Sequence, residues 1–215
     1  MKPLSFFCFG LFALSAVACV SVEAELWQVP AVANANRLPP LEAVVELGPL
    51  YNTNATQPEE LLELLQSELH QNLAEPAAPY NFGYARLLVT QAAVRRSGRV
   101  LQVVQLLTML TPSLLGVPFE TYRTTLTAKL QIVDAQGEIV GEYEGQGESK
   151  VRVAMYHGYS QRTAPTLSDA QALRLALARI RPQLDTAAGR LQPRLLAAGR
   201  VEQLPVERLR PVGQR

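Results

Sequence analysis

The sequence predicts an α+β domain of two layers, in which an antiparallel sheet of about four strands carries two helices on one face. Three observations indicate this class. Two leucine-rich segments have helical spacing, several segments alternate between apolar and polar residues, and the segments follow one another in the order β-α-β-β-β-α. A composition of 48% hydrophobic and 18% charged residues in 215 is typical of a folded chain.

The first strand and the first helix are expected in the N-terminal half of the domain, which spans residues 41–190. Apolar and acidic residues alternate over residues 41–47 and predict a half-buried strand. Thr56-Gln57-Pro58-Glu59 then fits a capping box with Thr56 as the N-cap. His70 is expected on the helix surface. The predicted apolar stripe of this helix is Leu62, Leu65, Leu69 and Leu73.

Alternating residues predict the remaining strands. The second strand is expected from Tyr84 to Val94, and the third begins near Tyr122. Residues 134–137 form the turn to a fourth strand, because Gly137 accepts the positive φ that such turns need. Gly145 and Gly147 are expected to end that strand or to bulge it. A last short strand at residues 151–156 is left open.

The second helix is predicted from another capping box, Ser168-Asp169-Ala170-Gln171. Pro182 is expected to kink or shorten it. Residues 191–215 are basic and rich in proline, so they are interpreted as a weakly ordered tail. The stripe of this helix is Leu173, Leu177, Ile180 and Leu184.

The N-terminus predicts export. Residues 1–18 have one lysine, an apolar core and a closing run of small residues, which is typical of a signal peptide. Ala16-Val17-Ala18-Cys19 resembles the lipobox of bacterial lipoproteins, in which the cysteine becomes lipidated. Residues 19–40 then serve as a lipidated N-terminus and tether. Alternatively, cleavage after Ala24 leaves a soluble periplasmic protein.

The cysteine count favours the lipoprotein reading. Cys8 lies in the removed segment, so the mature chain has Cys19 alone and cannot form an internal disulfide. The expected location is the cell envelope, at the outer membrane facing the periplasm.

Residues 100–119 form an uncharged, mainly apolar run in the middle of the domain, with Arg95, Arg96 and Arg99 before it and Glu120 and Arg123 after it. Two interpretations remain open. The run is a buried strand followed by a packed loop, or it is a contact surface for a membrane or a partner. Proline at two positions excludes a regular helix through its second half. The predicted contact residues within the run are Leu114, Leu115, Val117 and Phe119.

The search for chemistry predicts no catalytic residue, cofactor or metal. The chain has two histidines and lacks the HxxxH and CxxC spacings of metal sites and the GxSxG and P-loop motifs. Ser160, His157 and Asp169 make a catalytic set on paper, but sequence proximity is not geometry. Tyr156, His157 and Tyr159 are more suited to the rim of a partner site.

The charge balance gives no reason to expect nucleic-acid binding. Cleavage before Cys19 removes one charge, Lys2, and leaves 19 basic and 19 acidic residues, a net charge of zero.

A resemblance to known proteins runs through residues 87–184. The strings that carry it are TPSLLGVPFETYRTTLTAKLQIVDAQGEIVGEYEGQGESK, AMYHGYS and ALRLALARIRPQL, which look like a group of uncharacterised small lipoproteins of Gram-negative envelopes. More distantly, the element order is similar to curli-secretion lipoproteins and to lipoprotein activators of penicillin-binding proteins. That second similarity is architectural and transfers no site residue, because a shared fold does not carry function.

Two classes of function are therefore expected. The first is a non-catalytic envelope lipoprotein that docks a protein partner or assembles with copies of itself at the membrane. The alternative is a periplasmic binding module for an apolar or amphiphilic ligand such as lipid. An enclosed apolar cavity beneath residues 100–119 favours the ligand, whereas a projecting apolar loop favours assembly or membrane contact.

Overall fold

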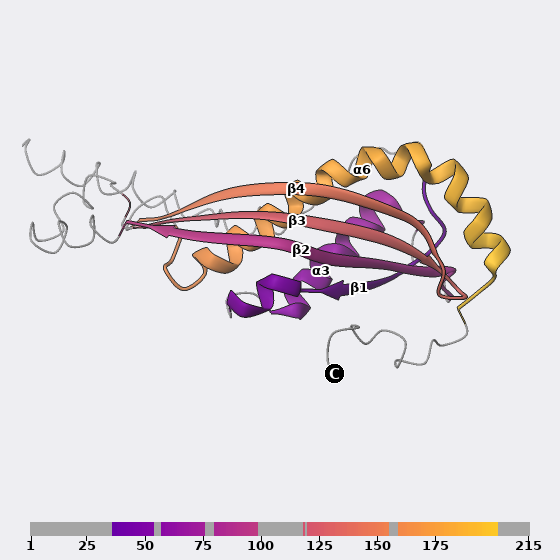
Figure 1. The fold of residues 1–215 in the computed structure, drawn as a ribbon, viewed down its shortest axis with the longest axis horizontal. Coiled ribbons are helices and arrows are strands. Elements are labelled where there is room, and N and C mark those ends of the chain that lie inside the picture. Colours follow the sequence, from indigo (N-terminus) through magenta and orange to yellow (C-terminus); the bar gives the residue numbers. More distant parts are fainter. Residues whose placement is uncertain are drawn as a thin grey trace, which may run out of the picture.

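The predicted α+β class and the order of its elements are confirmed by the structure, a computed structural model that describes residues 36–53, 57–75, 80–98, 118, 120–154 and 159–201. Figure 1 shows three long strands with helices packed along them. The elements are β1 (Glu42–Glu46), the 3₁₀ helix η2 (Gly48–Thr53), α3 (Pro58–Glu68), the π-helical turn η3 (Leu69–Leu73), β2 (Gly83–Ser97), β3 (Glu120–Asp134), β4 (Ile139–Val153) and α6 (Ala164–Ala198).

The sheet has the order β1-β2-β3-β4 and is mixed rather than fully antiparallel. β2, β3 and β4 are antiparallel neighbours, as predicted, but β1 pairs with β2 in parallel. The reason lies in the connection between them. α3 stands between β1 and β2 in the chain, and a helical crossover brings the second strand back in the direction of the first.

The turn from β3 to β4 forms where it was predicted. The Asp134 carboxylate accepts the backbone N–H groups of Gln136 and Glu138, each at 2.9 Å. Gly137 takes a φ of 88°, which an L side chain rarely adopts. The turn joins two strands of 15 residues each.

Gly145 and Gly147 neither end β4 nor interrupt its pairing with β3, so that expectation was wrong. Both glycines face α6, which crosses β4 at close range. A Cβ atom on Gly145 would lie 2.3 Å from the carbonyl oxygen of Ala176, and one on Gly147 would lie 1.8 Å from that of Ala172. The glycines therefore serve close packing between the helix and the strand.

The core lies on one face of the sheet, and both helices contribute to it. In α3 the buried stripe differs from the prediction. Leu61 and Leu64 are buried, whereas the predicted Leu62 is half-buried. His70 is exposed, as expected. The predicted stripe of α6 is buried in full. Its members are Leu173, Leu177, Ile180 and Leu184. From the sheet, Leu87, Val89, Leu126, Ala128, Leu130 and Ile132 pack against these helices.

α6 begins at Ala164, so the predicted capping box at Ser168 was wrong. The helix enters through Pro165 in its first turn, where a missing N–H is tolerated. Ser160 accepts the N–H of Thr163, the N-cap residue, at 3.1 Å. At α3 the N-cap is Gln57, and the predicted cap Thr56 lies outside the described residues.

α6 continues for 35 residues to Ala198 and curves over the sheet (Figure 1). Pro182 does not shorten it, and this residue is exposed, on the side of the helix away from the core. Leu191 and Leu195 are buried, and the N–H of Val201 reaches the carbonyl of Asn81 at 2.8 Å. The expectation of a tail from residue 191 was therefore wrong for residues 191–201.

Within the described residues, no helix has both the length and the apolar character that crossing a bilayer requires.

Candidate functional site

The three long strands run past the start of α6 at one end of the sheet (Figure 1). This distal end consists of the strand ends at Ser97, Glu120 and Val153. Ser97 pairs with Thr121, so the chain leaves β2 and enters β3 at neighbouring positions. On β2 the last residues are exposed, and Val94 has 37% of its surface accessible. The uncharged run of the sequence is thus attached to the distal end.

A buried carboxylate, Glu120, stands at the base of the distal end with 2% of its surface exposed. It forms an ion pair with Arg96 and accepts a hydrogen bond from the Tyr122 hydroxyl at 3.1 Å. Gln161, just before α6, adds a further hydrogen bond. The Arg96 guanidinium also lies 5.8 Å from the centroid of the Tyr122 ring, within the range of a cation–π contact.

These contacts shift the pKa values of Glu120 and Tyr122. Burial alone would raise the pKa of Glu120, but the hydrogen bonds from Arg96 and Tyr122 and the charge of Arg96 together outweigh it, so the pKa lies below its usual value. Burial and the neighbouring Glu120 raise the pKa of Tyr122. The cluster therefore holds Glu120 as a carboxylate at neutral pH, where it fixes the ends of β2 and β3 together.

Next to this cluster, a chain of buried hydroxyl groups ties α6 to the sheet. Thr124 donates to Asp169 at 2.8 Å and accepts from Ser168 at 2.9 Å. Ser149 on β4 lies 2.7 Å from the Ser168 hydroxyl. Ser168 and Asp169 thus bind the sheet instead of capping a helix. Ser160 lies 2.7 Å from the Thr163 hydroxyl, outside the core, and His157 lies outside the described residues.

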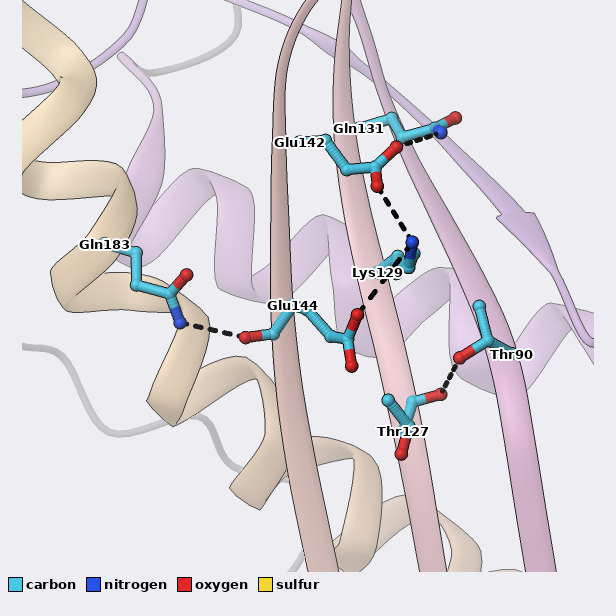
Figure 2. A network of polar contacts seen from close by, with 7 residues as sticks. All are labelled: Thr90, Thr127, Lys129, Gln131, Glu142, Glu144 and Gln183. Atoms are coloured by element: carbon cyan, nitrogen blue, oxygen red, sulfur yellow. Dashed lines mark hydrogen bonds and ion pairs between the residues drawn. The ribbon is translucent and has the colours of Figure 1, made fainter.

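The face of the sheet opposite the helices is open and polar. Figure 2 shows its central network, in which Lys129 lies 2.9 Å from one oxygen of Glu142 and 3.9 Å from Glu144. Gln131 donates to Glu142 at 2.8 Å, and this bond, with that from Lys129, lowers the pKa of Glu142. From α6, Gln183 donates to the Glu144 carbonyl at 2.9 Å, at the edge of β4. The centre of the open face therefore has a slight excess of acid.

Towards the distal end, the same face becomes basic. In the strand register, Arg95 lies opposite Arg123, and Arg123 lies opposite Lys150. Three cations therefore stand in one row across β2, β3 and β4. Arg152 follows on β4, one position further along the same face. All four side chains are exposed. We refer to Arg95, Arg123, Lys150 and Arg152 as the basic patch. Within the described part of the chain, Arg123 forms an ion pair with Glu148.

A pocket of about 410 Å³ lies where β2 is irregular between Val89 and Gln91. It is open rather than enclosed, and its walls mix apolar and polar side chains: Pro49, Thr90, Gln91, Ala92, Ala93, Thr125, Leu126 and Thr127. It is not the enclosed apolar cavity that a lipid ligand requires.

Of the contact residues predicted from the sequence, Tyr159 is described. It is half-buried and packs against a small apolar group that includes Tyr122, Val151 and Leu167. Its N–H donates to the Arg152 carbonyl at 3.1 Å, which places it beside the distal end. The other predicted residues lie outside the described part of the chain: Cys19, Leu114, Leu115, Val117, Phe119, Tyr156 and His157.

The basic patch and the Glu120 cluster were not predicted from the sequence as sites. Arg95 and Arg123 flank the uncharged run in the sequence, which was a usable signal. Their alignment with Lys150 depends on the strand register, which the bulge between Val89 and Gln91 shifts.

Metal-ligand geometry is not found in the part of the chain that the structure describes, where no three histidine, cysteine or acidic side chains come together. No model of a known protein family matches the chain, and no curated protein matches it.

Proposed function

We propose that this protein is a non-catalytic lipoprotein of the cell envelope, anchored through Cys19 at the outer membrane, where its domain acts as an interaction or assembly module. The observation that carries the proposal is the distal end of the sheet. Two strands extend past the helical layer there, and the chain that joins them is the uncharged run at residues 100–119. The attachment of an uncharged run at this end of the sheet supports contact with something outside the domain.

The buried polar cluster around Glu120 also supports this proposal. Glu120, Arg96 and Tyr122 fix the two strand ends from which the run departs, so the attachment points are held rigidly while their flanks are exposed. The described pocket is open and partly polar, so it is not the enclosed apolar cavity expected for the alternative of an apolar ligand. A site presented on rigid strands is a common arrangement for recognition.

The anchoring half of the proposal is tested by fractionation of cells that express the wild-type chain or Cys19→Ala. The wild type is expected in the membrane fraction, because each buried acyl CH₂ contributes roughly 0.8 kcal/mol and several chains hold firmly. Cys19→Ala is expected in the soluble fraction. A soluble wild type that begins at Glu25 would show that cleavage follows Ala24 and that no lipid is attached.

The contact half is tested by the double substitution Leu114→Asp with Leu115→Asp. The expected result is an unchanged melting temperature together with loss of partner cross-linking or self-association. Leu69→Ala is the matched control for core damage, since Leu69 is 1% exposed and its truncation costs about 2–5 kcal/mol. A double variant that melts as early as this control would place the two leucines in the core and contradict the proposal.

A further inference from the structure

We propose that the basic patch docks the distal end onto the phosphate groups of an anionic phospholipid bilayer. The inference rests on the proposed envelope function and names the surface that the distal end meets. It begins with the row formed by Arg95, Arg123 and Lys150, which stand opposite one another on three adjacent strands.

Such a row opposes folding. Like charges placed directly opposite on neighbouring strands destabilise a sheet, and strands lie roughly 4.8 Å apart. The acid beside the row relieves this only in part. Glu148 pairs with Arg123, but the two side chains are 50% and 58% exposed, and exposed pairs contribute little. A cationic row retained in that register suits the binding of an anion.

The charge is also segregated along the open face. Glu142 and Glu144 surround Lys129 at the centre. Among the described residues of this face, the distal end holds the four cations of the basic patch against one acid, Glu148. The separation gives the open face a basic end and a weakly acidic middle. An anionic surface would therefore attract the molecule end-on, through the distal end, and not through the centre of the sheet.

A bilayer fits this patch better than an acidic protein does. Three of the four cations are arginines, whose guanidinium groups bind phosphate in pairs of hydrogen bonds. Clusters of four to eight basic residues beside an apolar segment are typical of contact with anionic lipid, and the uncharged run joins the sheet between Gly98 and Glu120. An acidic protein would need a matching row of carboxylates in fixed register, while lipid head groups rearrange around the cations.

The test is vesicle binding by the secreted chain from residue 19 with Cys19→Ala, so that no lipid anchor contributes. Vesicles of phosphatidylcholine mixed with phosphatidylglycerol are compared with phosphatidylcholine alone, at low and high salt. Binding is expected with the anionic vesicles and is expected to weaken as salt screens the charges. Each cation near such a surface strengthens binding by about fivefold, so Arg95→Gln with Lys150→Gln should weaken it about 25-fold.

Two further variants sharpen the result. Glu148→Gln removes the acid beside Arg123 and should strengthen binding by about fivefold. Arg179→Gln with Arg194→Gln removes two exposed cations from α6, outside the patch, and should leave binding near the wild-type value. The Arg95→Gln, Lys150→Gln chain should melt at or above the wild-type temperature, because the repulsion within the row is relieved.

Several outcomes would overturn the inference: no binding to anionic vesicles, equal binding to neutral vesicles, or full binding by Arg95→Gln with Lys150→Gln. Loss of an acidic protein partner on cross-linking in that variant, without vesicle binding, would assign the patch to a protein instead. Fractionation of the wild-type chain reports separately on the anchor, so a failed lipoprotein proposal and a failed docking proposal give different results.

Discussion

At the scale of single residues, Glu120 is held as a buried carboxylate by its neighbours. Arg96 supplies the opposite charge, and the Tyr122 hydroxyl donates to the remaining oxygen. These partners hold its pKa below the usual value in the folded chain against the opposing effect of burial. Because of this shift, the contribution of Glu120 to the free energy of unfolding depends on pH.

The stability that Glu120 contributes should therefore depend on pH. A carboxylate whose pKa is lowered by folding stabilises the protein above its unfolded pKa, and this contribution is lost as the pH falls through the folded value. Glu120→Gln should cost roughly 1.5–3 kcal/mol at pH 7, where a buried charge-assisted bond is lost. At about pH 3 the difference from wild type should shrink.

Denaturant unfolding at both pH values measures this effect. Glu148→Gln is the matched control, because its carboxylate is half exposed and its pair with Arg123 is open to solvent, so it should change stability little at either pH. A cost for Glu120→Gln that is the same at both pH values would show that shape, and not charge, holds the cluster.

At the scale of elements, the contact between α6 and β4 is set by Gly145 and Gly147. Carbonyl oxygens of the helix lie where the Cβ atoms of other residues would stand. Substituting Gly147 by alanine should therefore push the helix from the sheet and destabilise the fold by about 1–3 kcal/mol or more.

Gly189, which lies on α6, provides the control. It is exposed, and a Cβ atom there would meet nothing within 4 Å. Gly189→Ala should stabilise the helix by about 0.5–1 kcal/mol, since alanine is the better helix former. Thermal melts of the two variants should move in opposite directions. A neutral Gly147→Ala variant would mean that the helix and strand separate at little cost.

Much of the architecture could be predicted at this scale, because periodicity reflects which face of an element is buried. The stripe of α6 and the Asp134–Gly137 turn are examples, since each depends on residues close in sequence. The direction of β1 was also within reach, because an intervening α3 implies a parallel pair. The role of Gly147 was not, since its neighbour Ala172 lies 25 residues away. Ser168 had the local signature of a cap, but the buried Thr124 and Ser149 set its role.

The distal end shows the same limit for the candidate site. Arg95 and Arg123 were noticed as flanks of an uncharged run, but nothing local indicates that Lys150 completes a row with them. That alignment follows from pairing across three strands and an irregularity in β2. Sequence patterns report what a residue type prefers, and the register decides which residues of one type meet.

At the scale of the whole molecule, the domain extends further than composition suggested. Leu191 and Leu195 complete the core, and the backbone of Val201 returns to Asn81. The Arg200 guanidinium lies 3.9 Å from the centre of the Tyr80 ring. The basic, proline-containing sequence after residue 190 is therefore divided between a helix that belongs to the fold and the residues beyond it.

A truncated chain tests this boundary. A chain that ends at Arg190 loses both buried leucines and should be destabilised by at least about 4 kcal/mol, since each such loss costs about 2–5 kcal/mol. A chain that ends at Val201 keeps these contacts and serves as the control. Comparable melting temperatures for the two truncated chains would show that residues 191–201 do not stabilise the domain.

The place where the chain enters the domain has a consequence for orientation. Asn36 donates its N–H to Asp185 at 3.4 Å, on the C-terminal half of α6, whereas the distal end lies beside the start of that helix. The 17 residues from Cys19 to Ala35 span at most about 60 Å when extended, and a strand of 15 residues is about 50 Å long. With the lipid that we propose on Cys19, this length limits how far the domain travels from its membrane without fixing which way the sheet points. Under the same proposal, the reach allows the domain to lie along its own bilayer or to stand upright with the strand ends facing away from it, and the proposed docking of the basic patch would select between the two postures.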